Sequence, residues 1–331
     1  MFYSILRSPI ASPEAMHIPD GFLSAPVAIL AWIVTIAFIV IAVRRASREF
    51  DERMVPLMGI LAAFIFAAQA FNFPLLGGTS GHFLGGALAA ILLGPWPALL
   101  VMASVIGLQG LIFQDGGLLA MGANIFVMGI VTVWVGYFTY QVLMRFNRYV
   151  AAFVAGWLSV VVAAVVCAFL LAVSGTAALG VVLPAMAGVH VFIGVGEGLI
   201  TAAAVALVRA ALPGMFGQQV TGRKTDNGTI IAGGVVVALI VGILAVFFAS
   251  PHPDGLEKVA ENKGFLNAAQ GPLFKIIPDY SVPGVANSAL AGIIAIVLGT
   301  LLLTAVGYGI ARSLSRRRQR SLVEAPVEVQ N

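Results

Sequence analysis

Two adjacent residues, Met16 and His17, carry nitrogen donors at a spacing that suits a metal ion. In a chain that begins at Met16, the α-amine, the main-chain nitrogen of His17 and the His17 imidazole can close fused chelate rings of about five and six atoms. His82 would supply a fourth nitrogen, and four nitrogens in a plane suit Ni(II) or Cu(II), while Co(II) can use the same donors with looser geometry. The alternative is that each histidine is only a polar cap at a membrane interface.

The amine ligand requires Met16 to be the first residue of the mature chain. Residues 1–15 contain no apolar run of signal-peptide length, and Pro13-Glu14-Ala15 is a poor cleavage site. Either translation starts at Met16, or a protease removes the extension. We favour a start at Met16 and expect residues 1–15 to be absent from the mature protein.

The elements that position these donors are predicted to be membrane-spanning helices. Of the 331 residues, 60% are hydrophobic and 10% are charged, against roughly 25% charged residues in an average soluble domain. The apolar runs are rich in glycine and alanine and apolar on every face, which favours packed helices over a barrel. Runs of the length that a spanning helix needs occur at 25–43, 54–72, 118–142, 150–173, 185–208, 229–249 and 287–311.

A further apolar region, residues 83–112, is too long for one span. Gly94, Pro95, Trp96 and Pro97 interrupt it and would break any helix that ran through them. We interpret it as two spans, of which the first, Phe83–Leu93, is too short to cross the hydrocarbon unaided. The fold class predicted is therefore an all-α bundle of about nine transmembrane helices, with a seven-helix core and a C-terminal pair.

Basic residues indicate the orientation of this bundle. With the Met16 segment outside, the cytoplasmic segments should collect Lys and Arg, and they hold 14 of the 18 basic residues. The same parity places three distant segments together outside: Met16–Gly21, Asn72–His82 and Gln114–Gly117. The cytoplasmic set comprises Arg44, Arg45, Arg48, Arg53, Arg145, Arg148, Arg209, Arg223, Lys224, Arg312, Arg316, Arg317, Arg318 and Arg320.

Composition also divides the chain. A polar stretch separates the first seven spans from the final pair, whose long outer loop carries Pro-Asp-Gly-Leu-Glu at 253–257. The predicted units are the extension 1–15, a metal-capture domain 16–212, a cytoplasmic linker 213–228, a two-helix accessory domain 229–311 and a cytoplasmic tail 312–331.

The motifs of the first unit resemble those of a known family. Met16-His17-Ile18-Pro19-Asp20-Gly21-Phe22-Leu23 is similar to the N-terminal signature of the nickel and cobalt capture components of energy-coupling-factor transporters, the CbiM/NikM type. The outer-loop motif resembles the PDGLE accessory domain found with them. Further similar stretches are 78–86, 111–117, 122–124 and 190–201, and the chain departs from the family in its 15-residue extension and in Val127, where many relatives have a second Asn.

The resemblance implies a transport component rather than an enzyme. The metal ligands would be Met16 through its amine, His17 and His82, and Co²⁺ or Ni²⁺ would be cargo rather than a permanent cofactor. Energy would come from a transmembrane coupling component and cytoplasmic ATPase subunits, in agreement with the absence of a phosphate-loop motif from this sequence. The protein would be a multi-pass protein of a prokaryotic inner membrane, in contact with lipid and with no nucleic acid, and its site would face outside.

Several polar residues near the predicted outer face could support the ligands. Asp20 lies in a Pro-Asp-Gly run that could close the N-terminal segment over the site as a plug, or it could be only a turn residue. Ligating histidines are usually oriented by a neighbouring hydrogen-bond partner. The candidates for that role are Thr79, Ser80, Gln109 and Asn124, each of which could equally be a helix cap or a packing residue.

An intramembrane pair, His190 and Glu197, supports a rival function. They lie two helical turns apart on one face, and an ionisable group inside a span is functional by default. We favour a hydrogen-bonded pair that fixes helix packing. The alternative is a stand-alone proton-coupled metal transporter that uses the pair as a relay, although the inverted repeats of such transporters are not evident. A metalloenzyme is a third reading, weakened by the lack of an acid or base beside His82.

Overall fold

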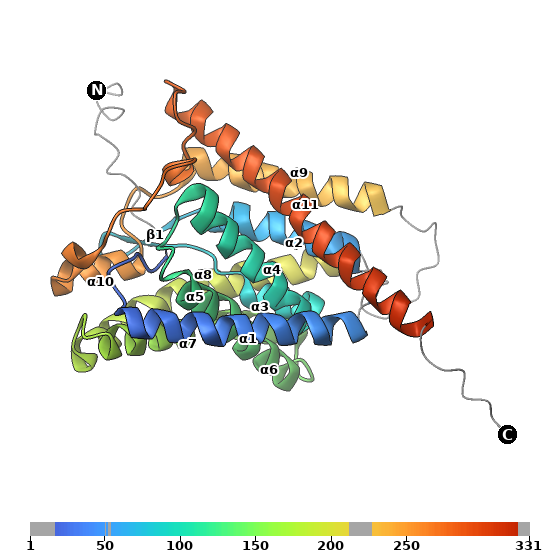
Figure 1. Ribbon diagram of the computed structural model, residues 1–331, viewed down its shortest axis with the longest axis horizontal. Helices are drawn as coiled ribbons and strands as arrows, with labels where there is room; N and C mark the ends of the chain where they lie inside the picture. The colour runs from blue at the N-terminus through green and yellow to red at the C-terminus, as the bar shows by residue number, and fades with distance from the viewer. Residues whose placement is uncertain (1–16, 50, 52–53, 212–226, 324–331) are drawn as a thin grey trace.

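The computed structural model describes residues 17–49, 51, 54–211 and 227–323, and these form a bundle of long helices (Figure 1). The chain is an all-α integral membrane protein, as predicted. Within the described ranges, seven helices are long and apolar enough to cross a membrane. Met16, residues 1–15, Arg53, Arg223, Lys224 and most of the predicted linker lie outside the described residues.

The first unit contains the predicted spans in the predicted order. Because lipid offers no hydrogen-bond partner, each apolar run satisfies its own main chain by forming a helix. The α-helices of this unit are α1 (Ala25–Glu49), α2 (Met54–Gln69), α3 (Gly86–Leu93), α4 (Pro95–Leu108), α5 (Met121–Asn124), α6 (Thr132–Leu143), α7 (Arg148–Val173) and α8 (Leu179–Ala211).

The predicted break in the apolar region 83–112 lies at one residue, Gly94. Gly94 has φ 78°, a left-handed value that ends α3, and Pro95 begins α4 as its first residue. Trp96 and Pro97 do not interrupt the chain further, since proline is tolerated in the first turn of a helix. The short α3 is buried among α4, α6 and α7, which is the shielding that its length requires.

Two helices contain π-helical stretches at the end of the bundle where the loops gather. α4 continues into η2 (Gln109–Phe113), and η3 (Ile125–Val131) joins α5 to α6. A π turn inserts a residue and turns side chains out of register, and such stretches are frequent at functional sites. Here they flank the loop that carries Asp115 and the helix that carries Asn124.

The segment between α2 and α3, which the sequence analysis placed outside without any secondary structure, is a hairpin. Strands β1 (Phe73–Leu75) and β2 (Thr79–Gly81) pair antiparallel around Gly77 and Gly78, both of which have positive φ. Its strands, of three residues each, are too short to be predicted from an alternation of apolar and polar residues. It delivers His82, the residue directly after β2, to the interior of the bundle.

Glycine lets α7 and α8 pack closely, as the sequence suggested. A side chain at Gly198 would lie 2.6 Å from the main-chain oxygen of Phe153, and one at Gly194 would lie 2.9 Å from Trp157. Small residues at a membrane interface allow such an approach. Gly196, which lies between these two glycines on α8, instead packs against the ring of Phe73 in the hairpin.

The C-terminal unit packs on the outside of α2. Its helices α9 (Asn227–Phe248) and α11 (Ser288–Val323) both contact α2, and the loop between them folds across the end of the bundle (Figure 1). That loop contains a helix not foreseen from the sequence, α10 (Gly255–Lys263), capped by the side chain of Asp254. It also contains the short helices η5 (Leu266–Ala268) and η6 (Pro278–Tyr280).

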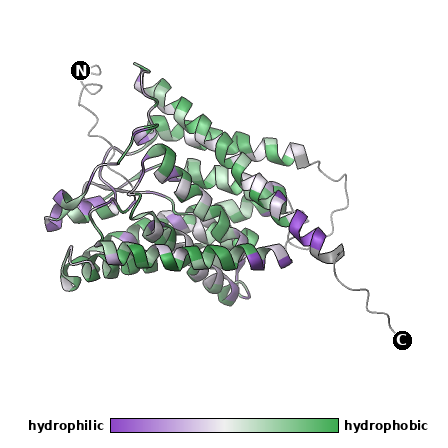
Figure 2. Cartoon of the chain, in the orientation of Figure 1, coloured by the Kyte–Doolittle hydropathy of each residue, from purple (hydrophilic) through white to green (hydrophobic). Residues whose placement is uncertain are grey.

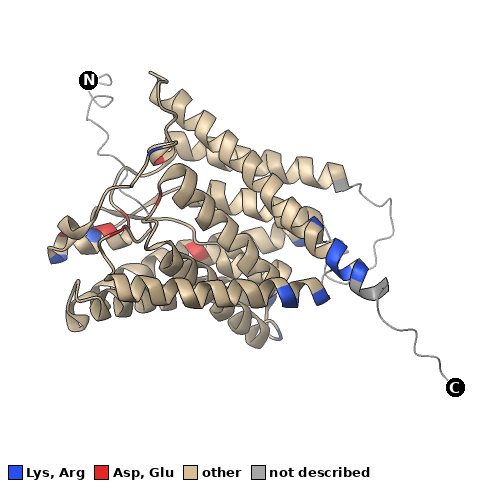
Figure 3. Cartoon of the chain, in the orientation of Figure 1, with Lys and Arg blue, Asp and Glu red and all other residues tan. Residues whose placement is uncertain are grey.

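Hydropathy and charge are arranged along the axis of the bundle. Apolar residues cover the long helices, and polar residues concentrate in the loops and at the end of α11 (Figure 2). Arginines gather at the ends of α1 and α11 away from the hairpin, whereas acidic residues gather in the loops at the opposite end (Figure 3). The candidate ligands lie at this acidic end, so the two ends differ in charge as the parity argument required.

Candidate metal centre

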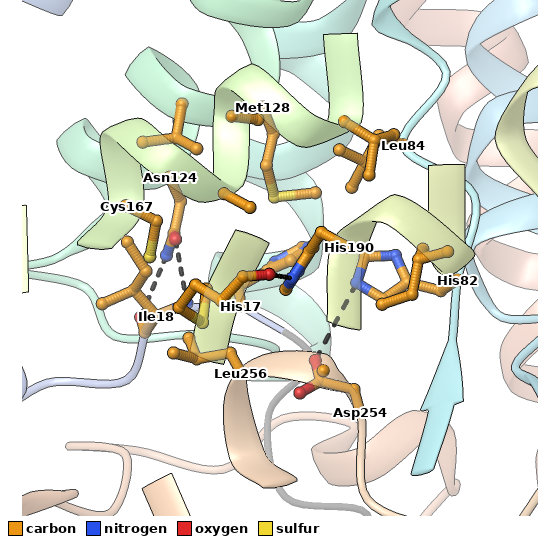
Figure 4. A pocket seen from close by; sticks show the side chains of 17 residues that line it. His17, Ile18, His82, Leu84, Asn124, Met128, Cys167, His190, Asp254 and Leu256 are labelled. Carbon is orange, nitrogen blue, oxygen red and sulfur yellow. Dashed lines mark hydrogen bonds and ion pairs between the residues drawn. The ribbon is translucent and has the colours of Figure 1, made fainter. Parts of the chain in front are cut away.

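His17 and His82 lie side by side in the interior of the acidic end. Their ring centroids are 6.1 Å apart at an interplanar angle of 64°, and the two residues are 2% and 9% exposed. Both line a cavity of about 60 Å³ (Figure 4), together with Ile18, Leu84, Asn124, Val127, Met128, Val160, Ala163, Ala164, Cys167, Met186, His190, Ile193, Asp254, Gly255 and Leu256. The structure therefore brings together two predicted ligands that are far apart in the sequence.

The His17 ring is held through one nitrogen only. Nδ1 lies 3.1 Å from the main-chain oxygen of Asp115 and 3.6 Å from its carboxylate oxygen Oδ1. A carbonyl oxygen can only accept, so Nδ1 carries the hydrogen and Nε2 keeps its lone pair. Nε2 is buried and has no hydrogen-bond partner, which is costly for a polar atom. A ring with this arrangement is prepared to bind a ligand through Nε2.

His82 is also held through its Nδ1, but its Nε2 has a carboxylate nearby. Its Nδ1 lies 3.2 Å from the main-chain oxygen of Phe83, and its Nε2 lies 3.9 Å from Oδ2 of Asp254 (Figure 4). Metal-ligating histidines usually donate their second ring nitrogen to a carbonyl or carboxylate. Both histidines follow that pattern, with main-chain carbonyls in the supporting role that the sequence assigned to side chains.

The two histidine side chains would need further donors from the main chain to hold a metal ion. Among the residues that the structure describes, no three His, Cys, Asp or Glu side chains gather as a metal site. The predicted set needs just two of them, His17 and His82, and takes its other nitrogens from the main chain. The chelate derived from the sequence would use Nδ1 of His17, and closing it would first require the contact with Asp115 to break.

Asn124 fastens the segment after His17 to α5. Its Oδ1 accepts from the main-chain nitrogen of Ile18 at 2.9 Å, and its Nδ2 donates to the oxygen of Ile18 at 3.0 Å. The nitrogen of Gly117 donates to the same oxygen at 3.0 Å. Asn124 therefore supports the site by holding the main chain beside His17.

Asp20 fixes the other end of the N-terminal segment. Its carboxylate accepts hydrogen bonds from the main-chain nitrogens of Leu118 at 3.0 Å and Ala120 at 2.9 Å. Its main-chain oxygen accepts a hydrogen bond from the main-chain nitrogen of Gln270 at 2.7 Å. A side chain at Gly117 would lie 2.1 Å from Asp20 Oδ1, so only glycine allows this approach. Asp20 is thus more than a turn residue, because it attaches the segment to two separate loops.

Replacing Asp20 with alanine should loosen this segment without removing a proposed ligand. Two partly buried main-chain donors lose their acceptor, and each costs about 1–3 kcal/mol when left unsatisfied. We expect Ni(II) to leave the purified Asp20→Ala protein roughly tenfold faster or more in a chelator chase, each 1.4 kcal/mol being a factor of ten. Asp51→Ala, at the opposite end of the bundle, is the control, and equal dissociation rates in the two variants would contradict the role of Asp20.

The other predicted supporting residues contact the C-terminal unit rather than the histidines. The Ser80 hydroxyl donates to the main-chain oxygen of His252 at 2.8 Å, and Thr79 donates to that of Pro253 at 3.1 Å. Gln109 donates from Nε2 to the Tyr280 hydroxyl at 3.0 Å. The histidine rings lie instead against the main-chain oxygens of Asp115 and Phe83.

Glu197 and His190 are not joined by a hydrogen bond in the described part of the chain, contrary to the preferred interpretation. Glu197 is fully buried, and its two oxygens accept from the main-chain nitrogens of Leu84 at 2.6 Å and Gly85 at 2.9 Å. His190 donates from Nδ1 to the oxygen of Met186 at 2.8 Å and lines the cavity. Glu197 therefore fixes the chain just after His82, which gives it a structural role.

Three residues near the histidines were missed as candidates. Asp115 and Asp254 stood in stretches that the sequence had singled out, and a carboxylate directly before a glycine was the available signal. Burial raises the pKa of Asp254 from 3.8 to about 7. Tyr280 carried no signal, since its approach to Asp115 depends on how the outer loop folds.

Comparison with known proteins gives the family. The model of the cobalt uptake substrate-specific transmembrane region, CbiM, matches residues 17–215, and the PDGLE domain model matches residues 228–316. The chain belongs to the CbiM family. It is a CbiM/NikM-type component fused to a PDGLE domain, as the motifs indicated.

Relatives share both units of this CbiM family member. A fused NikMN protein of Archaeoglobus fulgidus is 38% identical over 304 residues, which cover 90% of this chain and 98% of the relative. The fused nickel transport protein NikMN of Rhodobacter capsulatus is 28% identical over 346 residues, covering 91% and 99%. A crystal structure described as a truncated transition metal transporter is 32% identical, with a TM-score of 0.55. The match covers 59% of this chain and 99% of the chain in that structure. The protein is therefore a cobalt or nickel transport component and not an enzyme.

Proposed function

We propose that this protein captures Ni²⁺ or Co²⁺ for an ATP-driven energy-coupling-factor importer. The observation that carries the proposal is the pair of buried rings, His17 and His82, which line one cavity beneath the N-terminal segment. Each ring has its Nδ1 on a main-chain oxygen, the buried Nε2 of His17 has no hydrogen-bond partner among the described residues, and the Nε2 of His82 faces Asp254 at 3.9 Å. Nickel is the first choice, because relatives that share both units carry nickel in their names.

The remaining nitrogens in this proposal are the terminal amine of Met16 and the main-chain nitrogen of His17. The amine would lie one residue from His17, and the main-chain nitrogen between them would complete the donor set. Such a set binds in the deprotonated form, so protons compete with the metal. When the ion enters, the His17 ring can either keep its contact with Asp115 and bind through Nε2, or release it and bind through Nδ1 as part of the chelate.

Charge supports the orientation in the membrane that this proposal requires. Lys and Arg are enriched on the cytoplasmic side of membrane proteins, and arginines gather at the end of the bundle away from the histidines (Figure 3). In a prokaryotic inner membrane the site would then face outside. The sequence contains no phosphate-loop motif, so in this proposal a transmembrane coupling component and cytoplasmic ATPase subunits bind the basic end and supply the energy.

A proton-coupled transporter is less well supported. Both oxygens of Glu197 already accept main-chain hydrogens, and the Nδ1 of His190 is bound to Met186. A relay would need these groups to exchange protons with each other. The geometry instead favours Glu197 as a structural acceptor.

The position of the terminal amine provides the direct test. Protein that begins at Met16, with its first residue verified by intact-mass spectrometry, should bind one Ni(II) per chain. Protein that keeps residues 1–15 has an amide in place of the amine, and its affinity should fall by more than the roughly 10- to 100-fold that loss of a supporting residue costs. The two proteins share every histidine, so the comparison isolates the amine. Equal affinities would exclude the amine as a ligand, and absence of binding to both would contradict the proposed function.

A further inference from the structure

The outer loop of the C-terminal unit reaches the His17 side of the metal centre through one tyrosine. We propose that Tyr280 is a positioning residue for His17 and acts through Asp115. The inference rests on the proposed function, in the mode in which His17 keeps its contact with Asp115 and binds the ion through Nε2. It assigns to the PDGLE unit a specific chemical contribution to the site of the first unit.

A chain of hydrogen bonds carries the proposal. Gln109 Nε2 donates to the Tyr280 hydroxyl at 3.0 Å, and that hydroxyl donates to Oδ2 of Asp115 at 2.6 Å. Asp115 in turn faces Nδ1 of His17 with its main-chain oxygen at 3.1 Å and its other carboxylate oxygen at 3.6 Å. A hydrogen bond to an ionised acceptor is stronger than a neutral one, so the Tyr280 contact holds the Asp115 carboxylate in one orientation.

Asp115 has few other ways to be held. Asp115 is 5% exposed. Its Oδ1 is buried and has no hydrogen-bond partner among the described residues, although it lies 3.6 Å from Nδ1 of His17. Without the Tyr280 hydroxyl, neither carboxylate oxygen would have a short hydrogen bond within the described part of the chain. The carboxylate would then be free to rotate against the His17 ring and to disturb its contact with the Asp115 main chain.

Tyr280 itself is held in place firmly. Its ring stacks on Phe113, with centroids 4.9 Å apart at 13°, and lies 5.9 Å from Phe66. Its φ of 53° is in the left-handed region, as is that of Asp279 at 52°. Such conformations are uncommon outside glycine, so the surrounding contacts must maintain them. The loop accepts this strain where it places a hydroxyl against Asp115.

The test is a double-mutant cycle on the full chain. Tyr280→Phe keeps both ring contacts and removes only the hydroxyl, and Asp115→Asn keeps the main-chain oxygen that His17 uses. We expect Tyr280→Phe to weaken Ni(II) binding by roughly tenfold, the lower end of the range for residues that orient a ligand. The d–d absorption band of bound Ni(II) should also shift or broaden, because the ring no longer has one orientation. Tyr149→Phe, an exposed residue at the basic end, is the matched control and should behave as wild type.

The double variant shows whether Tyr280 acts on His17 through Asp115. If Tyr280 acts through Asp115, adding Tyr280→Phe to Asp115→Asn should cause no further loss, since coupled residues are non-additive. Fully additive losses, or a Tyr280→Phe protein with wild-type affinity and spectrum, would overturn the inference while leaving the proposed function intact. A wild-type protein that binds neither Ni(II) nor Co(II) would overturn both.

Discussion

His82→Ala and His17→Ala should each abolish stoichiometric binding of Ni(II) and Co(II) to the purified protein. Each change removes a ring nitrogen from a buried cavity of about 60 Å³ in which polar donors are few. Loss of a residue that merely orients a ligand costs roughly 10- to 100-fold in affinity. Loss of the ligand itself should exceed that, so the affinity should fall by more than about 100-fold.

The measurement is equilibrium dialysis in detergent with metal analysis of the protein fraction. His252→Ala is the matched control, because His252 is exposed and lies in the loop next to Asp254. His17→Ala keeps the contacts of Asn124 with Ile18, so the N-terminal segment should stay in place. Near-normal binding by either variant would remove that histidine from the ligand set. Loss of binding in His252→Ala as well would mean that the assay reports a general disturbance.

Glu197→Ala should destabilise the protein strongly and weaken metal binding as a consequence. The change leaves the main-chain nitrogens of Leu84 and Gly85 without an acceptor in the interior. Each unsatisfied buried donor costs about 1–3 kcal/mol, so the loss should be about 2–6 kcal/mol. Glu197→Gln keeps one acceptor oxygen and should lose roughly half as much. The midpoint of thermal unfolding in detergent provides the comparison.

Leu199→Ala is the control for this experiment. Leu199 is on the same helix, two residues away, and is 59% exposed in the bundle, so its truncation should cost little. If Glu197→Ala were no less stable than Leu199→Ala, the structural role of Glu197 would be wrong. A Glu197→Gln protein with normal stability and metal binding but no transport would instead return the proton relay as the explanation.

The sequence alone determined the membrane class and the order of the spans. In lipid every main-chain group must be satisfied within its own segment or barrel, so a long apolar run is a helix wherever it lies. Gly94 and Pro95 end one helix and begin the next for equally local reasons, a positive φ and a missing donor. The Met16-His17 signature and His82 were likewise visible, because their chemistry depends on residue type and on short spacing.

Tertiary structure decided how the metal centre is supported. His17 meets Asp115 across 98 positions, and Tyr280 meets the same residue across 165. No local pattern records such contacts, since they follow from how helices and loops pack. From the sequence, Thr79, Ser80 and Gln109 were candidates either to orient the histidines or to act as caps and packing residues. In the structure these side chains bind the C-terminal unit, and main-chain oxygens lie beside the rings.

Glu197 shows the same division most clearly. Its position in an apolar helix marked it as a buried ionisable group, and a two-turn spacing from His190 suggested a partner on its own helix. The partner is instead the main chain after His82, more than 110 positions earlier. Helical periodicity can tell which residues share a face, but only the packing of α8 against the hairpin and α3 determines which donors that face meets.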